Sequence, residues 1–122
     1  MRRDLGAAGI TLIVMTVIAV TGLSADMGAH PFWADTVAWV GLPIGLALAI
    51  SLRWVRLSWG VRMAILVAVI ALAYAFAAYG KGQFAASYAE DKLAGQFWFF
   101  GWIAAMTGLS GVLFTALGKT WR

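Results

Sequence analysis

Four long apolar stretches constrain what this chain can fold into. They cover residues 5–23, 36–52, 61–79 and 93–117, and no Asp, Glu, Lys, Arg or His lies in the central part of any of them. A helix needs about 20 mainly apolar residues to cross the roughly 30 Å of hydrocarbon in a bilayer. The sequence therefore predicts an all-α, polytopic membrane protein, a single domain of 122 residues with four transmembrane helices in two consecutive hairpins.

The composition excludes a water-soluble fold and most nucleic-acid binders. Hydrophobic residues make up 63% of the chain and charged residues 11%, with a mean hydropathy of +0.88, whereas a soluble domain carries about 25% charged residues. The net charge of +4 comes from loops and ends rather than from one basic face, so no nucleic-acid partner is predicted. Cysteine is absent, which excludes disulfides and thiolate metal sites.

The first apolar stretch has two interpretations. It follows Met1, Arg2, Arg3 and Asp4, and Gly22 and Ser24 near its end resemble the small residues of a signal-peptide cleavage site. A signal peptide, however, has an apolar core of only about 7–15 residues. The length of 5–23 therefore favours a retained transmembrane helix.

The central segment 51–62 predicts the orientation. It contains Arg53, Arg56 and Arg62, no acidic residue, and the aromatic residues Trp54 and Trp59. Lys and Arg concentrate in short cytoplasmic loops, and Trp favours the membrane–water interface. The basic residues at the chain ends and in this segment are Arg2, Arg3, Arg53, Arg56, Arg62, Lys119 and Arg122, whereas the other two loops, 24–35 and 80–92, hold only Lys81 and Lys92. Both termini are therefore predicted to be cytoplasmic.

Small residues predict where helices approach one another. Gly41, Gly45 and Ala49 follow one face of the second predicted helix, around Pro43, and Gly108 and Gly111 lie in the fourth. Rows of this kind allow close helix contacts in membranes. The sequence leaves open whether the Gly41 row meets a helix of its own chain or another protein.

The third stretch contains a second row of small residues, Ala64, Ala68, Ala71 and Ala75. We expect this row to be the packing face of the third helix, with larger side chains toward lipid.

Capping signals predict where the helices begin. Asp35 or Thr36 can cap the second helix and Ser58 the third. The segment Ser87-Tyr88-Ala89-Glu90 matches a capping box, which predicts that the fourth helix begins near Tyr88, ahead of its apolar part.

Aromatic residues crowd the start of the fourth stretch. Phe97, Trp98 and Trp102, together with Trp54 and Trp59, predict an interfacial belt or a partner-facing surface. The alternative is a flat site for a quinone, a carotenoid or a lipid tail. We favour the belt, because a bound lipid, quinone or pigment has no further residue pattern to support it.

The sequence predicts no catalytic, cofactor or metal site. Proton relays and ion-coupled transporters place ionisable residues within the membrane, and none lies there in this chain. The only histidine, His30, precedes a proline in a loop and lacks partner ligands. The scattered hydroxyls, including Tyr74, Thr107 and Ser110, are expected to bond to backbone carbonyls or across helices.

The expected function is that of a small non-catalytic subunit or assembly factor of a larger inner-membrane complex, which can be respiratory, photosynthetic or transporting. Its expected partners are membrane lipids and other integral membrane subunits, or copies of itself. The alternative is a small homo-oligomeric channel or transporter for a neutral or weakly charged solute. The Ala-rich composition, with Arg more frequent than Lys, is associated with a GC-rich bacterial source.

Overall fold

The computed structural model describes residues 2–118, and this part of the chain is helical and contains no strand. The helices are α1 (Arg2–Thr21), α2 (Leu23–Asp26), α3 (Ala34–Trp54), α4 (Trp59–Ala86) and α5 (Lys92–Leu117). Within the described residues, α1, α3, α4 and α5 are each long and apolar enough to cross a membrane. The predicted all-α fold with four membrane-length helices is confirmed. Lys119 and Arg122, two of the predicted cytoplasmic charges, lie outside the described residues.

The helix ends differ from the predicted ones at both loop-rich segments. The first helix stops at Thr21 because Gly22 adopts a left-handed conformation, with φ of 71°, before the short α2. The third membrane helix continues to Ala86, although Gly80, Lys81 and Gly82 were predicted to begin a loop. Gly80 is buried against α5, so tertiary packing outweighs the low helix propensity of glycine at this point.

One of the three predicted caps agrees with the structure. The Ser58 hydroxyl accepts a hydrogen bond from the Val61 N–H, as predicted. Neither Asp35 nor Thr36 caps α3, since the helix already begins at Ala34 and the residue before it, Trp33, makes no side-chain cap.

The capping box at Ser87 was a wrong prediction. Ser87 is the C-cap residue that follows α4, and its hydroxyl donates to the Phe84 carbonyl. Tyr88 and Ala89 have φ values of 56° and 67°, which are incompatible with a right-handed α-helix. Asp91 caps α5 instead, accepting a bond of 3.0 Å from the Ala94 N–H.

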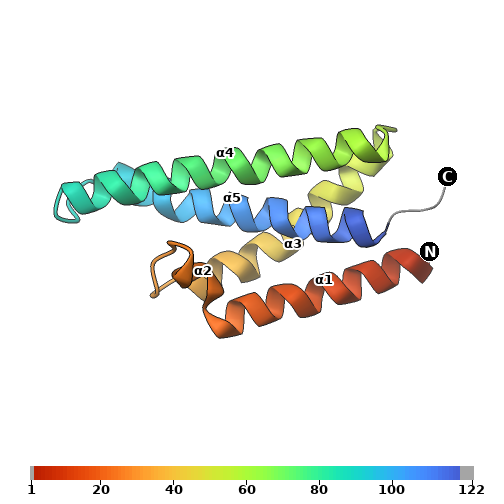
Figure 1. The fold of residues 1–122 in the computed structure, drawn as a ribbon, viewed down its shortest axis with the longest axis horizontal. Helices are drawn as coiled ribbons and strands as arrows, with labels where there is room; N and C mark the ends of the chain where they lie inside the picture. Colours follow the sequence, from red (N-terminus) through yellow and green to blue (C-terminus); the bar gives the residue numbers. More distant parts are fainter. Residues whose placement is uncertain (1, 119–122) are drawn as a thin grey trace.

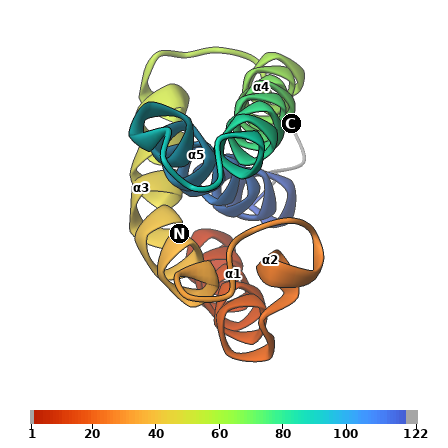
Figure 2. The same ribbon diagram turned by 90° about the vertical axis from the view of Figure 1, so that its left-hand side faces the viewer.

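Helix α5 is the centre of the bundle. Viewed along the bundle, α4 lies on one side of α5, and α3 and α1 lie on the other (Figure 2). Helices α3 and α4 hardly meet. The start of α1 and the end of α5 lie at one end of the bundle, and the α1–α3 and α4–α5 connections lie at the opposite end (Figure 1). We call this opposite end the connection end.

Glycines bring α3 into backbone contact with α5. A β-carbon at Gly41 would lie 2.5 Å from the Met106 Cβ, and one at Gly45 would collide with the Thr107 carbonyl oxygen. The Ser110 hydroxyl donates a bond of 2.9 Å to the Leu42 carbonyl across the same contact. The Gly41 row thus faces a helix of its own chain.

Helix α4 approaches the other side of α5 in the same way. β-Carbons at Gly101 and Gly108 would lie 2.8 Å from the Ala77 nitrogen and 2.6 Å from the Ile70 Cγ1. Gly111 lies near both neighbours of α5, because its β-carbon would lie 2.8 Å from Leu66 on α4 and 3.3 Å from the Gly45 carbonyl on α3. The predicted packing residue Ala49 is buried with Ala7 and Phe114, where α1, α3 and α5 meet.

Candidate functional site

An aromatic cluster closes the connection end of the bundle. His30, Trp33, Phe84, Trp98 and Phe99 come from the α1–α3 connection and from α4 and α5, and we call them the aromatic cap. The Trp33 ring lies 5.3 Å from that of Trp98 and 5.0 Å from that of Phe99, both edge-on. Edge-to-face contacts of this kind each contribute about 0.5–1.5 kcal/mol beyond burial, so the cap fixes three segments to one another.

Two long-range hydrogen bonds attach the α1–α3 connection to α4 and α5 next to the aromatic cap. The Trp98 Nε1 donates to the Gly28 carbonyl at 2.9 Å, and the Tyr74 hydroxyl donates to the Met27 carbonyl at 3.1 Å. Gly28 has φ of 124°, a conformation that favours glycine. Tyr74 and Ser110 therefore bond to backbone carbonyls of other segments, which confirms the expected role of these hydroxyls.

The aromatic residues that the sequence predicted to form one belt or partner surface lie in different environments. Trp98 and Trp102 are buried between helices and present no partner surface. Phe97 is 39% exposed and lies on the outside of the bundle. At the other end of the bundle, Trp54 is 79% exposed, whereas the Trp59 Nε1 donates to the Thr115 carbonyl at 2.9 Å.

Sequence reasoning missed Trp33 and Phe84 as members of the cap. Both flank loops, where aromatic residues carry no periodic signal, and only the fold brings them to Trp98.

His30 belongs to the aromatic cap rather than to a ligand set. Its Nδ1 accepts a bond of 3.0 Å from the Phe32 N–H, and its ring lies 5.4 Å from that of Trp98. In residues 2–118 no group of three or more His, Cys, Asp or Glu side chains could hold a metal ion. A metal site within this part of the chain therefore has no geometric support.

The opposite end of the bundle carries the predicted topology determinants. Arg53 lies in the last turn of α3, and its guanidinium pairs with the Asp4 carboxylate of α1 at 2.7 Å. Arg56 closes the α3–α4 turn with φ of 66° and is exposed, and Arg62 lies in the first turn of α4. The Arg53–Asp4 ion pair thus connects α3 to α1 at this end of the bundle.

Helix α4 has two contrasting faces. The residues that bury it against α5 are Leu66, Ala73, Ala77 and Gly80, which we call the inner row. On the opposite face, small residues follow at separations of three or four, so they align along one side. This outer row consists of Gly60, Ala64, Ala68, Ala71, Ala75, Ala78 and Gly82, and all seven are exposed.

The outer row is open along its length. β-Carbons added at Gly60 or at Gly82 would have no neighbour within 4 Å. A groove of about 390 Å³, lined by Leu72, Ala75, Phe76 and Tyr79, runs beside the row. The row Ala64, Ala68, Ala71 and Ala75, which was predicted to be the packing face of this helix, is exposed, and α4 packs within its own bundle through the inner row instead.

A scan against protein-family models and searches of curated proteins and of solved structures find no match to this chain. Functional inference therefore depends on the geometry of the chain itself. The main features are the exposed apolar face of α4, the aromatic cap at the connection end of the bundle, and the Asp4–Arg53 ion pair at the opposite end.

Proposed function

We propose that the protein is a non-catalytic subunit or assembly factor of a larger membrane complex, and that it binds a transmembrane helix of a partner on the outer face of α4. The observation that carries this proposal is the outer row, in which seven small residues, three or four positions apart, are exposed along one side of a membrane-length helix.

The chemistry of helix contacts in membranes supports this choice. Lipid tails are as apolar as leucine side chains, so helices associate through close packing and small residues at the contact. Inside the bundle, α4 already uses Ala73, Ala77 and Gly80 in this way against α5. The outer row repeats the same chemistry toward the outside, and the groove beside it can receive a larger side chain of the partner.

Two exposed aromatic side chains, Phe76 and Phe97, lie at the edge of the proposed contact surface. The Phe76 ring lies 6.3 Å from that of Phe97 on α5, and both side chains are exposed. Aromatic residues are enriched at protein–protein contacts. The sequence-based expectation of a partner surface at Phe97 therefore joins the outer face of α4 in a single proposed surface.

The proposed location is a bacterial inner membrane with both chain ends in the cytoplasm. Seven of the nine Lys and Arg residues lie in the terminal segments and in the segment 51–62, which contains the α3–α4 connection and the adjoining helix turns. This distribution supports the orientation, because Lys and Arg in short loops remain cytoplasmic.

A second candidate function uses the same face with a different occupant. If a second copy of the chain covers the outer row, the protein is a homo-oligomer, and a channel or transporter for a neutral or weakly charged solute becomes the better proposal. Proton-coupled transport has less support, since no ionisable residue lies in the middle of a predicted span.

Native mass spectrometry after mild extraction tests the proposal. We expect foreign membrane subunits to co-purify with the protein and to be lost from Ala71→Leu. The matched control Ala47→Leu adds the same bulk at an exposed alanine of α3 and should retain them. A homo-oligomer sensitive to Ala71→Leu supports the second candidate, and a monomer without partners contradicts both.

A further inference from the structure

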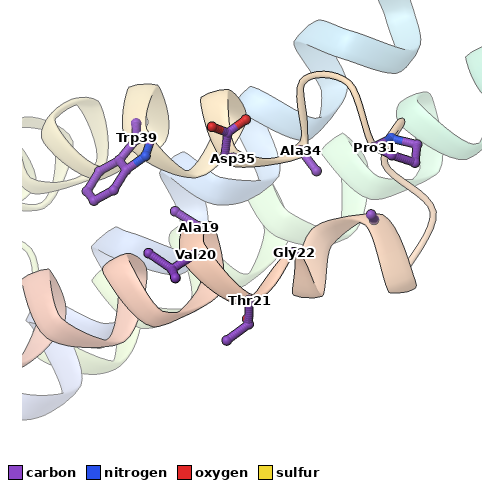
Figure 3. A pocket seen from close by; sticks show the side chains of 9 residues that line it. Ala19, Val20, Thr21, Gly22, Pro31, Ala34, Asp35 and Trp39 are labelled. Atoms are coloured by element: carbon purple, nitrogen blue, oxygen red, sulfur yellow. The ribbon is translucent and has the colours of Figure 1, made fainter.

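A pocket of about 500 Å³ lies between the end of α1 and the start of α3. Thr21 and Gly22 form one wall, and Asp35 and Trp39, one turn apart on α3, line the other (Figure 3). Its volume is within the range of about 300–1,000 Å³ that is usual for small-molecule sites. The pocket is distinct from the outer face of α4, so binding of a ligand in it does not depend on the proposed function.

The charge of this pocket favours a cation. Among the described residues, Asp35 is the only ionisable one that lines it, and Asp35 is exposed. The last turn of α1, which forms the facing wall, contains no basic residue. The last four carbonyls of a helix lack helical N–H partners and carry a partial negative charge. The Asp35 carboxylate and the end of α1 therefore both contribute negative potential to the pocket, and the partial positive charge at the start of α3 offsets only part of it.

Trp39 adds an aromatic surface for the same type of ligand. Its side chain is 43% exposed and follows Asp35 by four residues, which places both on one face of α3. The face of an indole ring attracts cations, with an ammonium ion within about 6 Å of the ring centre. A carboxylate and an indole ring one helical turn apart on the same wall are both suitable contacts for an alkylammonium group.

The position of the pocket indicates which kind of molecule would carry the ammonium group. The pocket lies at the ends of two membrane-length helices, the depth of lipid headgroups. Val20, which also lines it, is 76% exposed and continues the wall along α1 toward the hydrocarbon. A ligand with a cationic head and apolar chains fits both parts.

We propose that this pocket binds the headgroup of phosphatidylethanolamine, with its ammonium group at Asp35 and Trp39 and its acyl chains along α1. A primary ammonium has three N–H donors, which the Asp35 carboxylate can accept. The trimethylammonium of phosphatidylcholine has none, and phosphatidylglycerol has no cation. The site therefore discriminates among lipids by hydrogen bonding as well as by charge.

Lipid retention by the purified, delipidated full-length protein tests this proposal. The protein in detergent is mixed with equal amounts of phosphatidylethanolamine, phosphatidylcholine and phosphatidylglycerol, and native mass spectrometry measures which lipid remains bound. We expect phosphatidylethanolamine to be retained in preference to the other two. Asp35→Asn should weaken its retention about tenfold, the effect of losing a hydrogen bond to a charged group, and Trp39→Leu should weaken it about threefold.

The control is Asp26→Asn, which removes an acidic residue of the same connection that does not line the pocket. It should retain the lipid as the unaltered protein does. Soluble phosphoethanolamine, added as a competitor, should displace the lipid only weakly, because it lacks the chains that follow α1. Equal retention of the three lipids, or unchanged retention by a folded Asp35→Asn variant, would overturn the proposal. Full displacement by soluble phosphoethanolamine would overturn its lipid part.

Discussion

The two faces of α4 contain the same kind of residue but have different surroundings. On the inner face, Ala77 is fully buried, and a β-carbon at Gly101 of α5 would lie only 2.8 Å from its nitrogen. On the outer face, Ala75 is exposed and lines an open groove. A row of small residues thus indicates a close approach without indicating the approaching helix. One row of α4 meets a neighbour in the same chain, and we assign the other to a partner.

The largest expected effect comes from adding the same bulk to each face. Ala77→Leu places a large side chain where two backbones meet, and overpacking of this kind costs about 1–3 kcal/mol or more. We expect a marked loss of folded protein. Ala75→Leu should change stability by only about 0.5 kcal/mol, because its side chain points away from the bundle.

Thermal denaturation in mild detergent, followed by circular dichroism, measures both variants. Equal melting temperatures for Ala77→Leu and Ala75→Leu would remove the distinction between the faces.

A smaller substitution, glycine to alanine, compares the two faces of α4 at Gly80 and Gly82. A β-carbon at Gly80 would lie 2.5 Å from the Ala94 carbonyl oxygen, whereas one at Gly82 would meet nothing within 4 Å. Gly80→Ala should therefore lower stability by about 1–3 kcal/mol. Gly82→Ala should raise it by about 0.5–1 kcal/mol, because alanine is the better helix former.

The same melting experiment distinguishes the two variants by the sign of their effects. Stabilisation by both would mean that α4 and α5 are not in close contact at Gly80.

The sequence was sufficient to predict the membrane helices and insufficient to predict which faces meet. The length and apolarity of each stretch specify a membrane helix, because an unsatisfied backbone is too costly in lipid. Helix α4, however, is apolar all round, so no polar face marks its outside. Whether the inner row or the outer row of α4 packs against α5 depends on where the glycines of α5 lie. The sequence of α4 alone does not contain that information.

The connection end was harder to predict for another reason. Gly80, Lys81, Gly82 and Gln83 have the composition of a loop, yet they continue α4, because Gly80 contacts the α5 backbone. His30 and Trp33 are far from Trp98 in sequence, so the aromatic cap exists only after the helices assemble. Local patterns locate helices and turns, but contacts between distant segments need the fold.

The contact assigned to the outer row can be tested directly in the membranes of cells that produce the protein. The chain has no cysteine, so Ala71→Cys carries one thiol, to which a short photoactivatable crosslinker can be attached. Ile13→Cys, on α1 and 64% exposed in the unaltered protein, is the matched control. The account predicts a discrete crosslinked product that joins Ala71→Cys to another membrane polypeptide, and none from Ile13→Cys. The absence of a product from Ala71→Cys, or equal products from both positions, would contradict it.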